Sequence, residues 1–263
     1  MTWNLWWRFG GNWRERESGI RTTFETYRPD LAGLVETWAG EGTSQAERLG
    51  DVLTMDSAFV PTSLPPAPDP VEYPDQTGII IGIGLISRWR IINTEVHELP
   101  HGQRGGPAPT AMVSTLDHPR GPLHVVVACT EWEPEYAGDQ LAQTRALAAL
   151  AADARFDGRL PVLLVGDLNA AVDQSELAPV VESMVDTWTA GGGDPNAVTY
   201  DSTMPLTGPD ATKQLDRRID HVFARAGRPA HPVAVRRAFL AGDRPIDGVY
   251  PSDHYAVGVD LDP

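Results

Sequence analysis

RLPVLLVGDLNA, residues 159–170, decides the fold, because a short apolar run in it ends abruptly at polar residues. Val162 to Val165 are all apolar and are bounded by a proline and a glycine, a pattern typical of a strand buried on both faces. Asp167 and Asn169 follow, and residues two apart in an extended chain project to the same side. Such groups are costly at the end of a buried strand unless they are hydrogen-bonded or bind a ligand. The stretch predicts the floor of a functional site, with an ordinary strand-to-loop junction as the alternative.

The composition describes a globular chain that is long enough to bury a large core. Of its 263 residues, 41% are hydrophobic and 22% charged, and we expect one domain over residues 1–263. No apolar run approaches the roughly 20 residues that span a bilayer, and no charged region followed by an apolar stretch opens the sequence. We therefore expect a cytoplasmic protein without membrane contact. The single cysteine, Cys129, excludes an internal disulfide and a thiolate-rich metal site.

The charge balance narrows the class of partner. The chain has 21 Lys and Arg residues against 36 Asp and Glu residues, a formal net charge of −15. A protein that binds along a nucleic-acid duplex usually presents a basic face, so the charge argues against such a partner. Six arginines in the last third of the sequence form either a patch for one phosphate or separate solvated side chains. They are Arg217, Arg218, Arg225, Arg228, Arg236 and Arg237.

The first forty residues predict a strand, a helix and a second strand. Residues 1–8 are rich in aromatic residues and favour a strand, residues 15–27 show helical spacing of apolar side chains, and residues 31–35 form another apolar run. Asn4 lies inside the first strand and Glu36 ends the second. Because consecutive strands are commonly neighbours in a sheet, we expect these two polar side chains to meet.

The rest of the chain predicts more strands interrupted by few helices. The absence of an internal repeat or a clear linker favours one α/β domain built on two packed sheets. We expect strands at 113–116, 123–130, 219–224 and 255–261, helices at 139–156 and 174–184, and loops at 61–78 and 190–216, while 51–60 fits either a strand or a loop. Residues 79–92 predict one strand with a bend, or two strands that divide after Ser87. Loops as long as 190–216 usually serve a binding site.

Polar residues stand in strands or at strand ends where apolar residues are the norm. Their carboxylate and amide oxygens suit a hard cation such as Mg²⁺ or Mn²⁺, and a histidine beside carboxylates suits proton transfer or stabilisation of a developing negative charge. Together they describe metal-assisted attack of water on phosphorus. The residues are Asn4, Glu36, Asp167, Asn169, Asp220, Asp253 and His254.

The segments that carry these residues resemble, in order, the motifs of the endonuclease/exonuclease/phosphatase superfamily. They are TWNLW at 2–6, LVETW at 34–38, GLISRWRI at 84–91, GDLNA at 166–170, RRIDHVFA at 217–224 and PSDHYAV at 251–257. The resemblance implies a four-layer α/β sandwich, in which two mixed β-sheets pack face to face with helices outside. It also implies a site at one end of the sheets.

The same resemblance implies a metal side of the site. Glu36 would be the principal ligand of Mg²⁺ or Mn²⁺, and Asn4 a neighbour that ligates the metal or orients its ligands. Asp253 would lie on the same side.

The remaining motif residues would act on water and phosphate. Asp167 would position and activate the attacking water, and Asn169 would donate to the phosphoryl oxygens. His254 would bind the scissile phosphate, with its tautomer fixed by Asp220. Preorganised donors of this kind are commonly the largest catalytic contribution.

One motif departs from the family pattern. Many members carry a histidine, in a Thr-His-Leu context, just before the long helix, where this chain has ACTEWEPEY at 128–136. Depending on the alignment, Cys129 or Glu131 takes that place. A carboxylate there would bind a second metal or a substrate hydroxyl, and a cysteine would enlarge the pocket. Trp38 either stacks on a base or sugar ring or packs in the core, and Arg218 is a further candidate for substrate binding.

These observations predict a Mg²⁺- or Mn²⁺-dependent hydrolase of phosphoesters, either a phosphodiesterase or a phosphatase. Because of the charge of −15, a small phosphoester is favoured over duplex DNA as the substrate. A nuclease acting on DNA or RNA ends is the alternative within the same chemistry. A non-catalytic binding protein on the same scaffold is the alternative of another class. The sequence indicates no protein partner.

Overall fold

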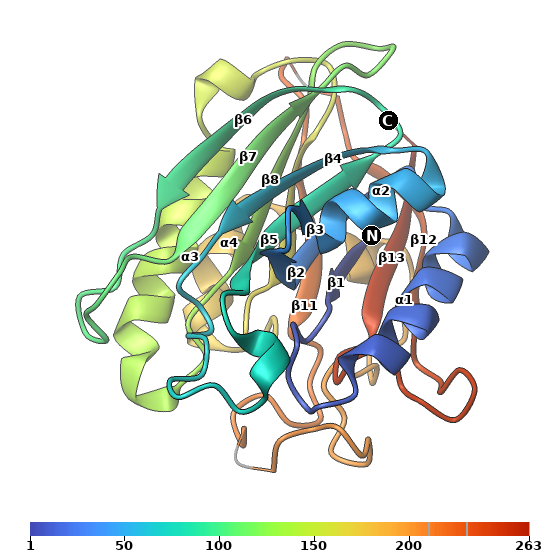
Figure 1. Cartoon of the computed structure of the whole chain (residues 1–263). Helices are drawn as coiled ribbons and strands as arrows, with labels where there is room; N and C mark the ends of the chain where they lie inside the picture. The colour runs from blue at the N-terminus through green and yellow to red at the C-terminus, as the bar shows by residue number, and fades with distance from the viewer. Residues whose placement is uncertain (210, 230, 263) are drawn as a thin grey trace.

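The computed structural model describes residues 1–209, 211–229 and 231–262, and over these ranges thirteen strands form two mixed β-sheets (Figure 1). The seven-stranded sheet has the order β12-β13-β1-β2-β5-β4, with β3 paired to β2. Its strands are β1 (Thr2–Asn4), β2 (Leu31–Gly40), β3 (Thr43–Ser44), β4 (Asp56–Pro61), β5 (Ile80–Ser87), β12 (Ala234–Ala241) and β13 (Ala256–Asp262). Only β1 and β2 are parallel neighbours in it.

The six-stranded sheet has the order β10-β11-β9-β8-β7-β6. Its strands are β6 (Ile91–Glu98), β7 (Thr110–Leu116), β8 (Leu123–Cys129), β9 (Val162–Asp167), β10 (Val185–Asp186) and β11 (Asp220–Arg225). β8 and β9 run parallel, with Cys129 opposite Asp167, and β11 runs antiparallel to β9, with Asp220 opposite Asp167. The polar end of β9 therefore lies between two strands that also end or begin there.

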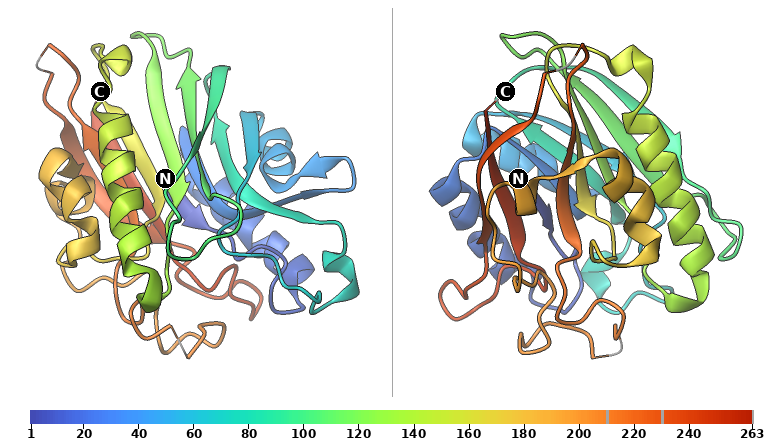
Figure 2. Two further views of the ribbon diagram at one scale, coloured as in Figure 1. Left: turned by 90° about the vertical axis from the view of Figure 1, so that its left-hand side faces the viewer. Right: turned by 180° about the vertical axis from the view of Figure 1, so that it is seen from behind.

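Helices cover the outer faces of both sheets, as Figures 1 and 2 show. α1 (Trp13–Tyr27) and α2 (Gln45–Leu53) lie against the seven-stranded sheet, and α3 (Ala137–Ala151) and α4 (Ala178–Ser183) against the six-stranded sheet. A short helix, α5 (Thr187–Ala190), follows β10. The layers confirm the expected four-layer sandwich. None of the described helices is long and apolar enough to cross a membrane.

The apolar run before Asp167 packs against an apolar layer on each face of β9. Leu163 and Val165 face the core between the two sheets, whereas Val162 and Leu164 face the helical layer that contains α3. All four side chains are buried. The alternation confirms a strand buried on both faces, because each face packs against its own apolar layer.

Among the elements that differ from the expectation, α2 and β12 have a clear physical reason. Residues 51–60 contain the end of α2 and the strand β4, and Ser44 begins α2 with a capping box that involves Glu47. β12 was not expected, because Arg236 and Arg237 interrupt its apolar pattern. Both arginines are exposed and pair with acidic residues of β13, so the strand keeps its place at the edge of the sheet.

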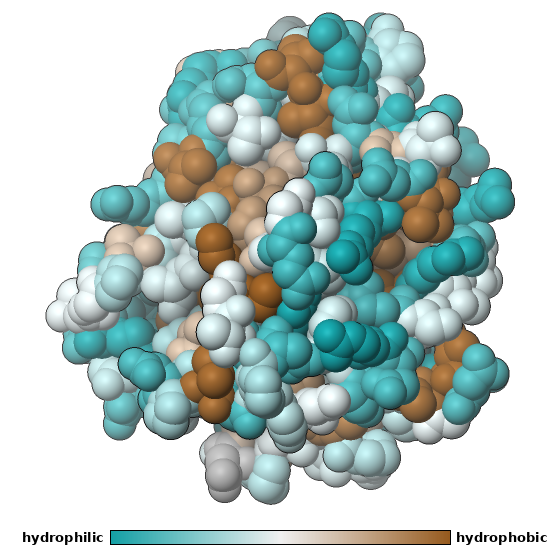
Figure 3. All heavy atoms as spheres, in the orientation of Figure 1, coloured by the Kyte–Doolittle hydropathy of each residue, from teal (hydrophilic) through white to brown (hydrophobic). Residues whose placement is uncertain are grey.

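The face of the molecule seen in Figure 1 is predominantly hydrophilic. In Figure 3 the hydrophobic residues on this face form separate groups that hydrophilic residues interrupt. The hydrophobic core lies between the two sheets and in the layers under the helices.

Gly166 provides a test of how the floor of the site is built. Its φ is 151°, and a Cβ atom there would overlap the carbonyl oxygen of Ala128 on β8. Gly166→Ala should therefore lower the free energy of unfolding by about 3 kcal/mol or more, measured by urea denaturation.

Gly102→Ala is the matched control, since nothing lies within 4 Å of its added Cβ. It should change stability by less than about 0.5 kcal/mol. Equal stabilities for the two variants would contradict this packing of β8 against β9.

Candidate active site

The polar residues predicted from the motifs come together where the two sheets meet at one end. Asn4 ends β1, Asp167 ends β9 and Asp220 begins β11, while Glu36 lies within β2 and His254 comes two residues before β13. The first and second sheets thus contribute to one buried cluster. In Figure 1 the loops that follow β1 and precede β13 gather at the lower end of the sandwich.

Glu36 leaves the strand ladder through a β-bulge. The register of β2 against β5 shifts between Leu34 and Thr37, and Glu36 has a φ of 49°. A residue other than glycine in this region costs on the order of 1–3 kcal/mol, and such strain gathers at functional sites. The backbone carbonyl of Glu36 accepts a hydrogen bond from Trp7 N at 2.7 Å, which holds the bulge against the segment after β1.

Asn4 connects the carboxylates of the two sheets. Its Nδ2 donates to Glu36 Oε1 at 2.8 Å and to Asp167 Oδ2 at 3.1 Å. Its Oδ1 accepts from the backbone N–H of Trp6 at 2.9 Å. These contacts place Asn4 between a carboxylate of each sheet.

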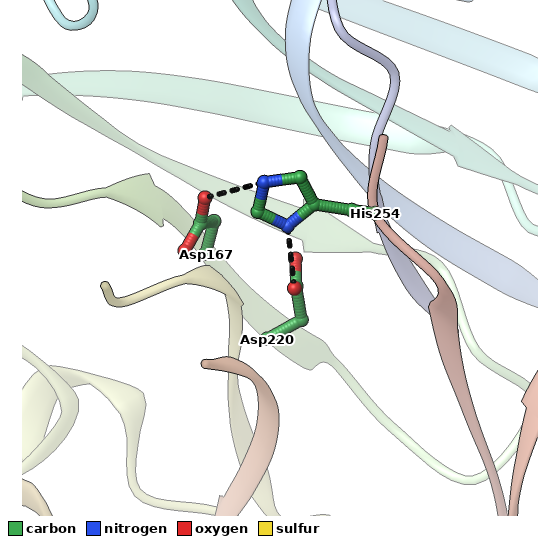
Figure 4. A group of neighbouring side chains, drawn as sticks. All are labelled: Asp167, Asp220 and His254. Carbon is green, nitrogen blue, oxygen red and sulfur yellow. Dashed lines mark hydrogen bonds and ion pairs between the residues drawn. The ribbon is translucent and has the colours of Figure 1, made fainter. Parts of the chain in front are cut away.

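His254 and Asp220 form a buried pair. His254 Nδ1 lies 2.8 Å from Asp220 Oδ2, and its Nε2 lies 3.8 Å from Asp167 Oδ2 (Figure 4). Burial alone would lower the pKa of His254, but Asp220, Asp253 and Asp167 together raise it well above its ordinary value. These carboxylates favour the protonated ring, and its Nε2 faces both Asp167 Oδ2 and Asn4 Nδ2, the latter at 3.5 Å.

The carboxylates of the cluster repel one another in a buried environment. Burial, with a further contribution from Asp253, raises the pKa of Glu36 to about 8. Burial and the proximity of Asp220 raise the pKa of Asp167 to about 7. Burial also raises the pKa of Asp253, against the opposing effects of His254 and Arg16. The protein's own cations therefore leave part of this negative charge uncompensated.

A divalent cation fits this donor set. Among the described residues, the ligand atoms of Asp167, Asp220 and His254 lie within 4.8 Å of one another, and Asp220 Oδ1 is buried without a hydrogen-bond partner. Glu36 adds a further, partly buried carboxylate next to Asn4. Oxygen-rich sites of this kind suit Mg²⁺ or Mn²⁺.

Asn169 is held close to Asp167 by its backbone and its side chain. It has a φ of 50°, and its backbone N–H donates to Asp167 Oδ1 at 3.0 Å. Its Nδ2 donates to the carbonyl of Thr130 at 3.0 Å and lies 3.9 Å from Cys129 Sγ. The second hydrogen of this amide has no strong acceptor among these contacts, so it is able to donate to a ligand.

Arg16 supports the site although the sequence analysis did not single it out. It is buried on α1 and donates to five backbone carbonyls, those of Leu5, Trp6, Trp7, Phe9 and Pro251. These carbonyls belong to the segments that follow Asn4 and precede Asp253. A charged residue on the apolar face of a predicted helix, four positions before Ile20, was the available signal.

Ser252 and Trp3 fix the segment that carries His254. Ser252 Oγ donates to the carbonyl of Asn4 at 2.6 Å and accepts from His254 N at 3.2 Å. Trp3 Nε1 donates to the carbonyl of His254 at 2.9 Å. These hydrogen bonds attach His254 to β1, which also carries Asn4.

The candidates for substrate binding near the missing histidine have other partners. Glu131 is fully buried and forms two short contacts with Arg104, at 2.6 and 2.7 Å. This pairing engages both carboxylate oxygens of Glu131 with the Arg104 guanidinium. Cys129 is buried beside Asn169, and burial raises the pKa of its thiol well above the ordinary value. It contributes a neutral, unreactive surface.

Trp38 packs in the core, the alternative to stacking on substrate. It is fully buried, donates from Nε1 to Glu17 at 3.0 Å, and lies under the guanidinium of Arg8 at 4.4 Å from the ring centroid. With no exposed ring face, it offers no stacking surface to a base or a sugar.

Arg218 also has a structural partner, and so do the other arginines of its group. Arg218 pairs with Asp186 at 3.0 Å and donates to His221 Nδ1 at 2.7 Å, and His221 Nε2 donates to the carbonyl of Ala170 at 2.8 Å. Each of the remaining five forms an ion pair with an acidic residue; they are Arg217, Arg225, Arg228, Arg236 and Arg237. Each of the six arginines is thus paired with a carboxylate.

His221 gives the fold a specific acid sensitivity. Burial, and then Arg218, lower the pKa of its imidazole to about 3, against about 6.5 in the unfolded chain. Between these values the unfolded chain binds a proton that the folded protein does not, so stability falls as the pH falls through this window. At about pH 5 the loss from His221 should reach about 2 kcal/mol.

His221→Gln removes this titration. The difference in free energy of unfolding between wild type and variant should therefore shrink by about 2 kcal/mol between about pH 7.5 and pH 5. A difference that does not depend on pH would contradict the buried neutral imidazole.

Comparisons with known proteins agree with this architecture. The chain is similar to D. rerio TDP2 complexed with single strand DNA product, with 18% identity, a TM-score of 0.72, and coverage of 100% of this chain and 97% of that chain. It is similar to the human Nocturnin catalytic domain with bound sulfate anion, with 18% identity, a TM-score of 0.72, and coverage of 99% and 92%. These likenesses concern the fold.

A third solved structure has a higher sequence identity. It is the endonuclease/exonuclease/phosphatase from Beutenbergia cavernae DSM 12333, with 25% identity, a TM-score of 0.68, and coverage of 99% of this chain and 70% of that chain. No curated protein matches the sequence. The model of the Endonuclease/Exonuclease/phosphatase family matches residues 1–254. The chain therefore belongs to the endonuclease/exonuclease/phosphatase family.

Proposed function

We propose that the protein is a divalent-metal-dependent hydrolase of phosphoesters, in which an activated water molecule attacks phosphorus. The observation that carries this proposal is the buried cluster of carboxylates around one imidazolium, with Asn4 bridging Glu36 and Asp167. A cation relieves the repulsion among the carboxylates, and a phosphate group accepts from the imidazolium. The cluster therefore suits both a metal cation and a phosphate group.

Glu36, with Asp253 beside it, would hold Mg²⁺ or Mn²⁺. We favour this side of the cluster over the group Asp167, Asp220 and His254, because His254 Nδ1 is engaged by Asp220 and a protonated ring cannot bind a metal. When bound, the ion supplies charge stabilisation to the phosphoryl oxygens and the leaving group. Asn4 would keep the Glu36 carboxylate in place through its Nδ2.

Asp167 would act as the general base. A pKa of about 7, which burial and Asp220 produce, matches the proton affinity of the base to neutral pH. The water oxygen forms a bond to phosphorus, its proton passes to Asp167, and the bond from phosphorus to the leaving group breaks. His254 Nε2–H and the Asn169 amide would donate to the phosphoryl oxygens as their charge grows.

A phosphodiester or phosphomonoester of modest size is the proposed substrate. The net charge of −15 disfavours a long polyanion, and the arginines of the last third of the chain are engaged in ion pairs. A nuclease acting on DNA or RNA ends is the second candidate. The structure of D. rerio TDP2 with single strand DNA product supports it, because that protein shares this fold.

The proposal is tested by hydrolysis of paired chromogenic phosphate mono- and diesters and of short single-stranded oligonucleotides. Each assay is run with Mg²⁺, with Mn²⁺ and with excess EDTA. Metal-dependent release of product would support the enzyme, and the preferred ester would distinguish phosphatase, phosphodiesterase and nuclease. No release from any of them would favour the non-catalytic binding protein.

Asp167→Asn and His254→Ala should each lower the rate by about 100-fold or more, since each removes a group that acts on the reacting atoms. The rate is measured under saturating metal, with circular dichroism to show that the fold is retained. A near-normal rate in either folded variant would overturn the assigned roles.

Glu36→Gln should raise the metal concentration needed for half-maximal activity by about tenfold or more, because an amide is a weaker ligand for a hard cation. Glu41→Gln is the control, since Glu41 is exposed and lies outside the cluster. An unchanged metal titration in Glu36→Gln would remove Glu36 from the metal site.

A further inference from the structure

The long loop between α5 and β11 places Thr199 between the start of β11, at Asp220, and the segment before β13 that carries His254. Thr199 is fully buried, and its Oγ1 accepts from the backbone N–H groups of Ile219 at 3.0 Å and of Asp220 at 3.2 Å. Its carbonyl accepts from Tyr255 N at 2.9 Å. One residue therefore fixes the backbone at Asp220 and the backbone next to His254.

Tyr200, the next residue, contacts the His254 ring itself. The two ring centroids are 4.8 Å apart, with an angle of 49° between the planes. Tyr200 is nearly fully buried, and its hydroxyl accepts from the backbone N–H of Gly208 at 3.0 Å. An aromatic ring packed against the imidazole restricts its rotation.

The same segment is anchored on its other side. Thr199 N and Tyr200 N both donate to the carbonyl of Arg217, at 2.9 and 3.2 Å, and Asp216 N donates to the carbonyl of Tyr200 at 2.8 Å. The segment is therefore fixed to the chain that leads into β11, and its contacts with Asp220 and His254 are set by the fold.

We propose that Thr199 and Tyr200 are positioning residues that hold the Asp220–His254 pair in the geometry needed to bind the scissile phosphate. Neither residue acts on the reacting atoms. Thr199 fixes the start of β11 relative to the segment that carries His254, and Tyr200 fixes the plane of the imidazole. The inference rests on the proposed function, because it assigns a phosphate to His254.

Thr199→Val tests the hydroxyl, because it removes the acceptor of two N–H groups while retaining the shape of the side chain. It should lower kcat by about 10- to 100-fold, since small displacements of a catalytic group are costly. Thr199→Ser should restore kcat to within about threefold of wild type, because it keeps the acceptor. The metal concentration for half-maximal activity should stay unchanged in both, since the proposed metal ligands are untouched.

Thr23→Val is the matched control for the loss of a buried hydroxyl. Thr23 lies on α1, and its hydroxyl donates to Gly19 O at 2.9 Å. Thr23→Val should keep the wild-type kcat.

Tyr200→Phe should also keep the wild-type kcat, whereas Tyr200→Leu should lower it about tenfold, because only the second variant removes the ring. Wild-type kcat in both Thr199→Val and Tyr200→Leu would overturn the proposal.

A proton resonance separates this inference from the proposed function. The proton between His254 Nδ1 and Asp220 should give a downfield signal that Asp220→Asn abolishes. Thr199→Val and Tyr200→Leu should shift this signal or broaden it by exchange, and Thr199→Ser and Thr23→Val should leave it unchanged. If the wild-type protein shows no turnover and the signal still shifts in Thr199→Val and Tyr200→Leu, the result would support positioning and reject the hydrolase. An unchanged signal in both Thr199→Val and Tyr200→Leu would overturn the positioning role.

Discussion

Repulsion among buried carboxylates is the constraint on which the site depends. Burial penalises each charge, and the neighbouring charges add to that penalty, so the pKa of Glu36 rises to about 8 and that of Asp167 to about 7. A fold retains such a cluster only if other interactions compensate for it. The imidazolium of His254, the amide of Asn4 and the guanidinium of Arg16 supply part of the compensation. In the proposed function, a divalent cation would supply the part that the protein lacks.

The two-sheet architecture makes this arrangement possible. Asn4 and Glu36 belong to one sheet and Asp167 and Asp220 to the other, so the cluster forms only when the sheets are packed. The hydrogen bond from Asn4 to Asp167 crosses between them at 3.1 Å. Arg16 supports the segments that carry the cluster through five backbone carbonyls. It therefore does not occupy the polar side chains of the cluster. Stability and function thus use different atoms of the same segments.

The sequence predicted the fold and the polar cluster because both leave local signals. The apolar run at 162–165 alternates between two cores, and Asn4 stands out in an aromatic strand. The order of the motifs then predicted two mixed sheets with outer helices, which the structure confirms. The roles assigned to individual side chains stay predictions until activity is measured.

What the sequence did not predict depends on contacts between distant segments. Thr199 lies in a loop without periodicity, and its hydroxyl gains importance only because β11 begins beside it. The ion pairs of Arg218 and Glu131 likewise require partners from distant parts of the chain, Asp186 and Arg104. β12 was obscured by its exposed arginines, whose partners lie on the neighbouring strand.

The position of a bound ion tests the central claim most directly. Crystals soaked with Mn²⁺ and measured at its absorption edge would locate the ion by its anomalous signal. The account predicts an ion bound by the carboxylate of Glu36, with the hydrogen bond between His254 Nδ1 and Asp220 retained. An ion ligated by His254 and Asp220, or no ion in the cluster, would contradict it.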